Sequence, residues 1–516
     1  MVHSRGMHLD PESLRTILGL KLRKFRQKKN LGLKEMAKLS GLSISYLSEI
    51  EKGRKYPKPD KLLVLAQSLD VSFDELVSLQ VDDELGPITE ILGSPFIREF
   101  PFHHYGIEME RLVNLVTNAP SRAVALIRTA LEIGHTYDIQ VEHFLFAALR
   151  SYQHMHQNYF EEIEGVAADF LRAHRDRHAE LSAASLKAAL EDDHGYSVSY
   201  DAFEQRPALR NLRSVRRDGR RPKLWVNDRL MGSQKAFALA RELGYLELGL
   251  KERSTTSSPL KVASFDQVIN DFKAAYFAGA VMIPRDALVA DLEAFFKRSS
   301  WSPAEMLALA SRYRSTPETF FYRLSQLLPK FFGLEELFFL RLTHRTAGDR
   351  FKLSKILNMS QLPIFHGLEP DEHYCRRWSG IRLLEAFKAQ LAAPDAALGS
   401  EFAIDGDVMA TAQRATFLAE DMELFVATSS RPLALVAGVT SSVSLGLLID
   451  RSFKRRVRFW NDPAIPQLEV NLTCERCGLS DDECDARVAP PTLFQATETR
   501  RQQEEQLAEL IAEASS

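Results

Sequence analysis

Residues 33–53 constrain the fold of this 516-residue chain more than any other part of its sequence. Leu33 to Ser40 has the length and apolar spacing of a short helix, and Gly41 accepts the positive φ of a tight turn. Ser43 is a residue type that caps a second helix, which is expected to end near Lys52. Two short helices joined by such a turn predict a helix-turn-helix.

The second helix of this motif carries the candidate base contacts. Ile44, Leu47 and Ile50 recur at helical intervals and are expected to pack inward, which leaves the polar side chains between them for DNA. Basic residues around the motif are expected to bind phosphates. The candidate DNA-binding residues are Arg23, Lys24, Arg26, Lys28, Ser43, Ser45, Tyr46, Ser48 and Arg54.

The segment resembles the lambda-repressor-type family, in which a Glu before a Gly-containing turn closes the second helix, as Glu51 and Gly53 do here. The family often has Gln where this chain has Leu33, a departure that bears on one customary phosphate contact and not on the fold. Residues 1–80 carry 15 Lys+Arg against 9 Asp+Glu, a net charge of +6, which fits a DNA partner. Because one motif buries little surface, we expect a homodimer on an inverted repeat. A small helical bundle without a DNA function is the alternative.

The four cysteines form a second informative pattern. Cys375 stands alone in YCRRW, whereas Cys474, Cys477 and Cys484 form a C-x2-C-x6-C group. The two-residue gap lets two thiolates point to the same side of a tight turn, and a distant cysteine can complete a four-thiolate shell around a metal ion or iron–sulfur cluster. The polar N-terminus lacks an apolar signal segment, so a reducing cytosol, where disulfides are uncommon, is expected. Redox thiols and buried spectator cysteines are the alternatives.

The middle of the chain begins with a predicted linker at 82–95 and a helical insert at 96–221. Apolar residues at i, i+3, i+4 and i+7 in the insert predict packed helix hairpins. The basic run from Arg210 to Lys223 is expected to be a solvated loop. The histidines expected to be lone surface residues rather than metal ligands are His143, His154 and His156.

The segments QKAFALARELGYLEL and DFKAAYFAGAVMIP, within residues 222–345, resemble the IrrE-like metallopeptidase fold. That fold carries His-Glu-x-x-His on a helix, so that two imidazoles hold zinc beside a general base. Here Arg241 and Tyr245 stand at the histidine positions and Glu242 alone is retained. The acidic third-ligand position, in VINDFKAA, is also unconvincing. We therefore expect a pseudo-peptidase domain without catalytic residues, whose pocket is open to reuse for a ligand.

A dense group of phenylalanines follows in this domain. Core packing is the expected reason for most of them, and an acyl-chain pocket is the alternative. The six residues are Phe320, Phe321, Phe331, Phe332, Phe338 and Phe339.

Residues 346–491 contain strand-length runs of small and β-branched residues, which predict a mixed α/β sensor domain, and residues 492–516 predict an exposed amphipathic helix. A helix-turn-helix, a degenerate IrrE-like segment, the CRRW motif and a terminal CxxC…C group before Pro490 and Pro491 occur in that order. This order resembles the short-chain fatty acyl transcriptional regulators, which include the propionate-catabolism regulators of actinobacteria. The resemblance covers residues 12–79 and 222–491.

The resemblance implies a regulator of short-chain acyl metabolism that senses an acyl-CoA derivative. It also implies a [4Fe–4S] cluster at the cysteines, with structural zinc as the alternative that the spacing leaves open. The implied ligands are Cys375, Cys474, Cys477 and Cys484, and the spacing before Cys484 is longer than in the family.

The expected fold is mainly α with a smaller α/β C-terminal part: a helix-turn-helix bundle at 12–80, a helical middle and a mixed α/β sensor domain. The predicted function is a cytoplasmic, DNA-binding transcriptional regulator that is not an enzyme. Its expected partners are a double-stranded DNA operator and an acyl-CoA-like small molecule. A membrane is not among them, because no stretch approaches the roughly 20 apolar residues that cross a bilayer. The alternatives are an IrrE-like metallopeptidase acting on a partner repressor and a protein-binding scaffold.

Overall fold

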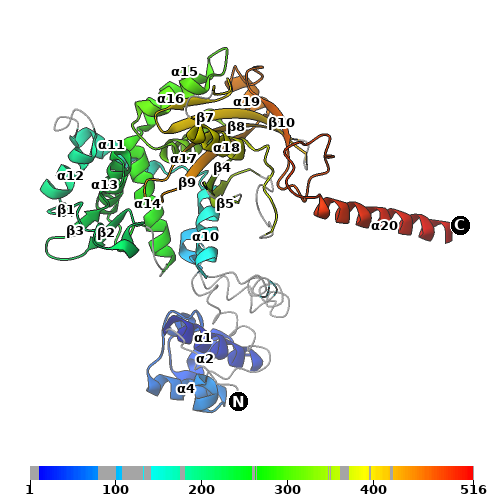
Figure 1. Cartoon of the computed structure of the whole chain (residues 1–516). Coiled ribbons are helices and arrows are strands. Elements are labelled where there is room, and N and C mark those ends of the chain that lie inside the picture. The colour runs from blue at the N-terminus through cyan, green and yellow to red at the C-terminus, as the bar shows by residue number, and fades with distance from the viewer. Residues whose placement is uncertain are drawn as a thin grey trace. The chain divides into compact units, whose positions relative to one another are not determined.

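The computed structural model (Figure 1) describes residues 11–78, 100–106, 129, 132, 141–174, 181–257, 262, 264–346, 348, 350–360, 371–393, 397–418 and 422–514. The chain divides into two compact units. One unit comprises residues Met1–Tyr152 and Ala263–Asp266, and the other comprises Gln153–Val262 and Gln267–Ser516. The predicted linker at 82–95 lies outside the described residues.

The first unit contains a bundle of five short helices. They are α1 (Pro11–Lys28), α2 (Leu33–Ser40), α3 (Ile44–Glu51), α4 (Pro59–Leu69) and α5 (Phe73–Val77). Their apolar faces form one core that includes Leu22, Met36, Leu47, Leu65 and Leu76. Gly41 has a φ of 66° between α2 and α3, as the sequence predicts. Gly19 lets α1 approach the end of α3, since a Cβ there would stand 2.4 Å from the carbonyl oxygen of Ile50.

Helices and a three-stranded sheet make up the middle of the chain. The elements are η1 (Phe102–Tyr105), α10 (Val141–Met155), α11 (Glu161–His174), α12 (Ala183–Asp192), β1 (Ser197–Ser199), η2 (Pro207–Leu209), β2 (Ser214–Arg217), β3 (Lys223–Val226), α13 (Gly232–Glu247) and α14 (Phe265–Met282). The strand order is β1-β3-β2, with β1 parallel and β2 antiparallel to β3. The prediction of a solvated loop at 210–223 is confirmed for residues 218–221, which are exposed and outside the strands, but it is wrong for residues 214–217, where β2 pairs with β3.

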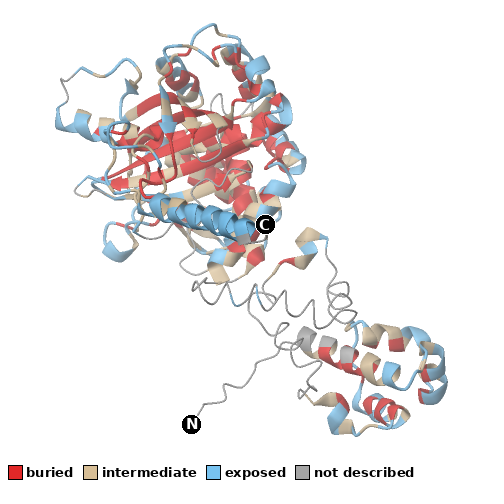
Figure 2. Cartoon of the chain, turned by 90° about the vertical axis from the view of Figure 1, so that its right-hand side faces the viewer, coloured by how far each residue is buried: buried red, intermediate tan, exposed pale blue. Residues whose placement is uncertain are grey.

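The second unit is built around a seven-stranded, mostly antiparallel sheet. Its strands are β4 (Leu337–Arg345), β5 (Phe351–Asn358), β6 (Ala403–Asp405), β7 (Val408–Phe417), β8 (Met422–Pro432), β9 (Val439–Leu448) and β10 (Gln467–Val470). The order is β10-β7-β8-β9-β4-β5, and β6 pairs with β7. Central strands β7, β8 and β9 are almost entirely buried, which explains their small and β-branched side chains (Figure 2).

Helices cover both faces of this sheet. One face packs on α15 (Arg285–Phe296), α16 (Pro303–Arg312), α17 (Pro317–Leu327) and η3 (Leu328–Phe332), with α19 (Arg451–Arg456) beside them. The other face packs on α18 (Ser379–Ala392). α20 (Thr492–Ala514) is exposed along its length, as predicted for the tail (Figure 2).

The expected fold class is confirmed: the helix-turn-helix helices stand at the N-terminus and the mixed sheet at the C-terminal end. The reading of the phenylalanines as core residues holds for five of the six. Only Phe331 is exposed, at 38%. No helix of the described residues is long and apolar enough to span a membrane.

Candidate DNA-binding interface and cysteine site

The helix α3 has the geometry of a recognition helix. The Ser43 hydroxyl caps it by accepting a hydrogen bond of 3.1 Å from the backbone N–H of Tyr46. Leu47 and Ile50 are fully buried and hold the helix on the bundle. Ser45 is exposed and the Tyr46 side chain is half-buried, so both lie where a base edge can reach them.

Ile44 does not pack inward as predicted. It is 44% exposed, because it is the first residue of α3 and a spacing of three residues drifts off the buried stripe of a 3.6-residue helix. An exposed aliphatic side chain at the N-terminal end of a recognition helix can contact a thymine methyl group. Ile44 is therefore a candidate base contact, although the apolar pattern predicted that it packs inward.

The basic run of α1 divides into structural and surface residues. The guanidinium of Arg26 forms a bidentate ion pair with Glu51, at 2.6 and 2.8 Å, and also donates to the carbonyl of Leu31. This geometry favours a role in holding α1 on the end of α3 over the predicted phosphate contact. The Lys21 ammonium is buried and donates to the Ser78 carbonyl at 2.6 Å, next to the end of α5.

The remaining basic candidates lie nearer the surface. Lys28 is exposed, and Arg23 and Lys24 are half-buried on the same helix. Arg54 follows α3 with a side chain that is 52% exposed and 3.5 Å from the carboxylate of Glu49. Side chains of this kind bind phosphates without reading sequence.

In the second unit, the two positions where IrrE-like peptidases carry histidine lie one turn apart on α13. The Arg241 guanidinium is 2.9 Å from the Asp271 carboxylate of α14, and the Tyr245 hydroxyl donates to the same carboxylate. Arg241 also donates to the carbonyl of Ser257 at 2.8 Å. Asp271 is the acidic residue of VINDFKAA. The sequence does not support it as a third ligand, but its side chain does face positions 241 and 245. The Arg241 side chain supplies the positive charge that a metal ion would supply there.

Glu242 is held in a separate network. Its buried carboxylate accepts hydrogen bonds from Arg253 at 2.6 Å and from the Tyr196 hydroxyl at 2.7 Å, and Arg216 lies 3.3 Å away. Burial raises the pKa of Glu242, and the hydrogen bond from Tyr196 and the nearby arginines oppose that shift. The carboxylate at the general-base position of this fold is here held by these side chains through a single oxygen, Oε1.

The four cysteines meet beside one edge of the large sheet. A β-bridge between Tyr374 and Thr473 aligns the two segments, with the Cys375 N–H donating to the Leu472 carbonyl at 3.1 Å. The Cys477 N–H donates to the Cys474 carbonyl at 3.2 Å, which forms the tight turn expected of a C-x2-C pair. The Cys484 N–H closes a further turn on the Ser480 carbonyl at 3.1 Å.

All four thiols are unpaired and buried, with exposed fractions of 5–7%. Burial raises the pKa of Cys375 to about 11, and proximity to Cys474 and Cys477 contributes to the shift. Burial likewise raises the pKa of Cys477, with contributions from Cys484 and Cys474. The predicted set is therefore brought together, and a buried thiol group of this kind becomes thiolate only when a positive charge accompanies it.

No three of the four sulfur atoms, all of which the structure describes, lie within 4.8 Å of one another. Tetrahedral zinc with Zn–S bonds of about 2.3 Å places its thiolates about 3.8 Å apart. Among the residues that the structure describes, the one group of three His, Cys, Asp or Glu ligand atoms within 4.8 Å of one another lies elsewhere in the chain.

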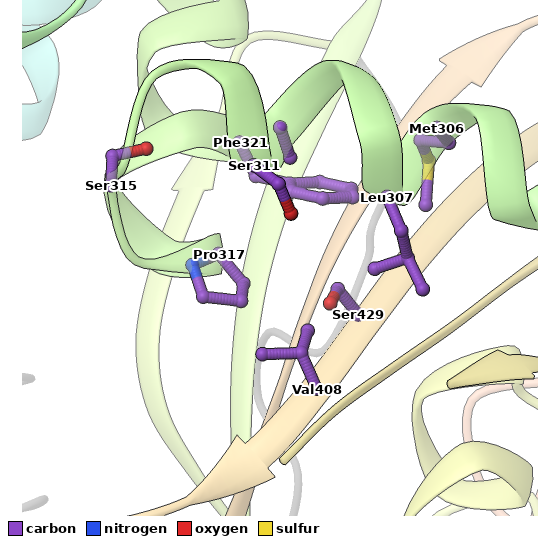
Figure 3. A pocket seen from close by; sticks show the side chains of 9 residues that line it. Met306, Leu307, Ser311, Ser315, Pro317, Phe321, Val408 and Ser429 are labelled. Carbon is purple, nitrogen blue, oxygen red and sulfur yellow. The ribbon is translucent and has the colours of Figure 1, made fainter. Parts of the chain in front are cut away.

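A small hollow, open to solvent, lies between α16, the first turns of α17 and the strands β7 and β8 (Figure 3). Apolar side chains and three serine hydroxyls line it: Met306, Leu307, Ala310, Ser311, Ser315, Pro317, Phe321, Val408 and Ser429. Phe321 is the member of the phenylalanine group that faces it.

A surplus of positive charge adjoins the first turn of α17. Arg341 and Lys355 stand directly opposite each other on β4 and β5, and lie 3.4 and 3.6 Å from the carboxylate of Glu318. Burial favours the neutral acid, but the charges of Arg341, Lys355 and Arg213 outweigh it and lower the pKa of Glu318 to about 2. Three cations thus share one carboxylate.

Comparison with known proteins finds a family match for the N-terminal helical bundle and another for the region around α13 and α14. The helix-turn-helix family matches residues 22–76, and the IrrE N-terminal-like domain matches residues 191–325. The uncharacterized HTH-type transcriptional regulator y4dJ of Sinorhizobium fredii is 40% identical over 65 residues, which cover 13% of this chain and 84% of that protein. The chain belongs to the helix-turn-helix transcriptional regulators.

A longer similarity links this helix-turn-helix regulator to RamB, an HTH-type transcriptional regulator of Mycobacterium tuberculosis. The identity is 23% over 286 residues, which cover 52% of this chain and 58% of RamB. A solved structure of a Mycobacterium tuberculosis transcriptional regulator covers 67% of this chain and is covered to 93%, with 18% identity and a TM-score of 0.44. The chain thus spans a little over half the length of the curated relative that it matches.

In this helix-turn-helix regulator the IrrE-like match begins at residue 191, whereas the sequence-based expectation begins the domain at residue 222. The match therefore includes the strands β1 and β2, which the expectation assigns to the helical insert. Three-residue and four-residue strands carry too little periodicity to be recognised from sequence alone.

Proposed function

We propose that this helix-turn-helix regulator binds an operator as a homodimer and that its second unit binds an acyl-CoA-like metabolite. We further propose that Cys375, Cys474, Cys477 and Cys484 hold a [4Fe–4S] cluster, and that the IrrE-like domain is not a peptidase. The observation that carries the DNA-binding function is the capped helix α3, with Ser45 exposed and Tyr46 half-buried, in a domain of net positive charge.

The metabolite proposal rests on two neighbouring features of α17. Pro317 and Phe321 line a small hollow whose apolar side chains and few hydroxyl groups are of the kind that contact a short acyl group. Glu318, in the same turn, is outnumbered by Arg341 and Lys355, which fit the phosphates of a coenzyme A derivative. To change DNA occupancy, the metabolite must bind one arrangement of the protein better than the other by a few kcal/mol.

The cluster proposal rests on four buried, unpaired thiols that neighbour one another. A four-iron cluster is proposed ahead of zinc because the family that the cysteine motifs resemble implies one. When bound, such a group supplies redox-sensitive crosslinking of the two segments. The protein's own contribution is the Tyr374–Thr473 bridge, which holds those segments in register.

Absence of peptidase activity is proposed from the charges of the IrrE-like domain. Arg241 and Tyr245 satisfy Asp271, and Arg253 engages Glu242, which leaves neither a zinc ligand set nor an available general base. A zinc-dependent cleavage assay on candidate repressors is expected to show no cleavage by the wild-type chain.

The test is a DNA-binding titration at fixed salt, with and without acetyl-CoA, propionyl-CoA and longer acyl-CoAs. Ser45→Ala with Tyr46→Ala is expected to abolish discrimination between operator and random DNA, whereas Lys28→Ala weakens both equally. If the double variant discriminates like wild type, the assignment of α3 is wrong. If no acyl-CoA changes the affinity, the metabolite proposal fails while DNA binding stands.

Anaerobic purification tests the cofactor separately. Broad visible absorption near 400 nm, with about four irons per chain, is expected for the cluster. A colourless protein with one zinc per chain would replace the cluster with the structural alternative.

A further inference from the structure

The first unit contains a set of metal-ligating side chains that the proposed function does not use. His103 and His104 lie on η1, and Asp266 lies in the first turn of α14, more than 160 residues later in the sequence. One ligand atom from each residue lies within 4.8 Å of the other two. We propose that these three side chains bind a divalent transition-metal ion, with zinc as the chemically favoured occupant.

The distances fit such an ion. The Asp266 Oδ1 is 2.8 Å from the His104 Nε2 and 3.6 Å from the His103 Nε2. Three nitrogen and oxygen ligands about 2.0–2.1 Å from a tetrahedral zinc stand about 3.4 Å apart, between these two values. A simple hydrogen bond between His104 and Asp266 does not require the second imidazole, whose ring centroid is only 4.0 Å from the first.

The donor set selects the kind of ion. Two imidazoles and one carboxylate suit zinc and other first-row divalent metals, whereas calcium and magnesium prefer oxygen ligands. The His103 side chain is 69% exposed and Asp266 is 42% exposed, so the fourth position would be open to water or to a further ligand. Adjacent histidines on one short turn also reduce the number of segments that must be ordered before the ion binds.

The surroundings fix the site in place. The Tyr105 hydroxyl donates to the Ala148 carbonyl at 2.6 Å, and the Phe100 ring stacks on the Tyr105 ring at 5.1 Å, which ties the histidine turn to α10. The His104 ring lies 5.4 Å from the Phe265 ring at the start of α14. A bound ion would connect η1, which follows the helix-turn-helix match in the sequence, to the first turn of α14. The helix α14 belongs to the IrrE-like match.

Metal counting on the full-length protein tests this proposal. The protein is purified anaerobically so that the cysteine site keeps its own cofactor, then titrated with cobalt(II) and with zinc. Wild type is expected to take up one further ion per chain, and the cobalt form is expected to show visible ligand-field bands without the near-ultraviolet thiolate charge transfer that cysteine ligands give.

His103→Ala and Asp266→Asn are the informative variants. Loss of an outer-shell partner already costs 10–100-fold in metal affinity, so removal of a ligand is expected to weaken binding by more than about 100-fold. His154→Ala is the matched control, because that histidine is exposed on α10 and outside the group. Because His103 is largely exposed, its truncation leaves the fold intact even if Asp266→Asn disturbs the start of α14.

The outcomes are distinct. Uptake of the extra ion by wild type and His154→Ala, with its loss in His103→Ala, supports the site. Equal affinity in His103→Ala and wild type, or no ion beyond the cysteine site in wild type, overturns it. A change in thermal stability of Asp266→Asn that is the same with and without zinc would show that the His104–Asp266 contact is a structural hydrogen bond only.

Discussion

Two regions of the second unit, the IrrE-like histidine positions and the four-cysteine group, differ in how their charges are balanced. At the IrrE-like histidine positions the Arg241 guanidinium stands 2.9 Å from the Asp271 carboxylate, so the region is neutralised by its own side chains. The cysteine region has four buried thiols, and burial raises the pKa of Cys375 to about 11. The charges of the first region are balanced without an ion, whereas the buried thiols of the second ionise only beside a positive charge, which the proposed cofactor would supply.

The largest effect is expected from the cysteine region. Cys474→Ser should remove the bound cofactor and destabilise the segments around residues 371–378 and 470–491, because metal binding in such sites contributes on the order of 10 kcal/mol to local folding. Ser480→Ala is the matched control, since it lies in the next turn of the same segment and keeps the carbonyl that accepts from Cys484. Metal content and limited proteolysis measure the effect. Full cofactor retention in Cys474→Ser would place the site elsewhere.

Breaking the self-neutralised region should cost less. Arg241→Ala leaves the largely buried Asp271 carboxylate without its cation, and we expect a loss of about 3 kcal/mol in the free energy of unfolding. Arg172→Ala removes an exposed partner of Asp169 and should change stability by less than about 0.5 kcal/mol. Chemical denaturation compares the two variants. Equal, small effects would show that Asp271 does not need Arg241.

Placing histidines at positions 241 and 245 should turn the self-neutralised region into one that binds a cation. Arg241→His with Tyr245→His presents two imidazoles one turn apart, facing Asp271, and we expect the double variant to bind one zinc ion. At a free zinc concentration 100 times the Kd, the stabilisation would be about 2.7 kcal/mol. Cleavage activity is not expected, because Arg253 and Tyr196 still engage Glu242.

Zinc-dependent thermal shifts measure this gain, with Arg241→His alone as the control. If the double variant takes up no zinc, residues 241 and 245 of α13 and residue 271 of α14 do not have the geometry of a zinc site. The similarity to a metallopeptidase would then be limited to the backbone fold.

The helix-turn-helix was predictable almost to the residue because its signals are local. Ser43 caps α3 and Gly41 adopts a positive φ, and each of these follows from residue type at one position. The exposure of Ile44 was missed because a strict three-residue spacing was read as a buried stripe. The ion pair of Arg26 with Glu51 was missed because it joins residues 25 positions apart.

The sites outside the helix-turn-helix bundle show the same limit more strongly. The C-x2-C turn is local and was predicted, whereas Cys375 was assigned to the same site from the cysteine count and a resemblance, because no local spacing ties it to the turn. The contact of Arg241 with Asp271 and the grouping of His103 with Asp266 depend on helices packing across the chain. A single sequence carries no signal for such pairs. The substitution of the zinc ligands was therefore visible in the sequence, but the ion pair that replaces them was not.

The smallest expected effect concerns Glu318, whose one carboxylate faces the positive charges of Arg341, Lys355 and Arg213. The pKa of Glu318 is lowered from its ordinary value of 4.5 to about 2, so the ionised carboxylate stabilises the folded chain in full above pH 4.5. That contribution is lost as the pH falls toward 2, because the carboxylate then becomes protonated in both states. Its side chain is 26% exposed, so we expect Glu318→Gln to cost about 1–2 kcal/mol at pH 7.

Denaturation of wild type and Glu318→Gln across the acid range measures that difference. The gap between them should be constant from pH 7 to about 5 and should narrow below pH 4.5, because only the wild type then loses a charge in its unfolded state. A bound anion should also reduce the cost, since phosphate groups can replace the carboxylate between Arg341 and Lys355. If Glu318→Gln is equally unstable with and without coenzyme A, the surplus cations serve the fold and not a ligand.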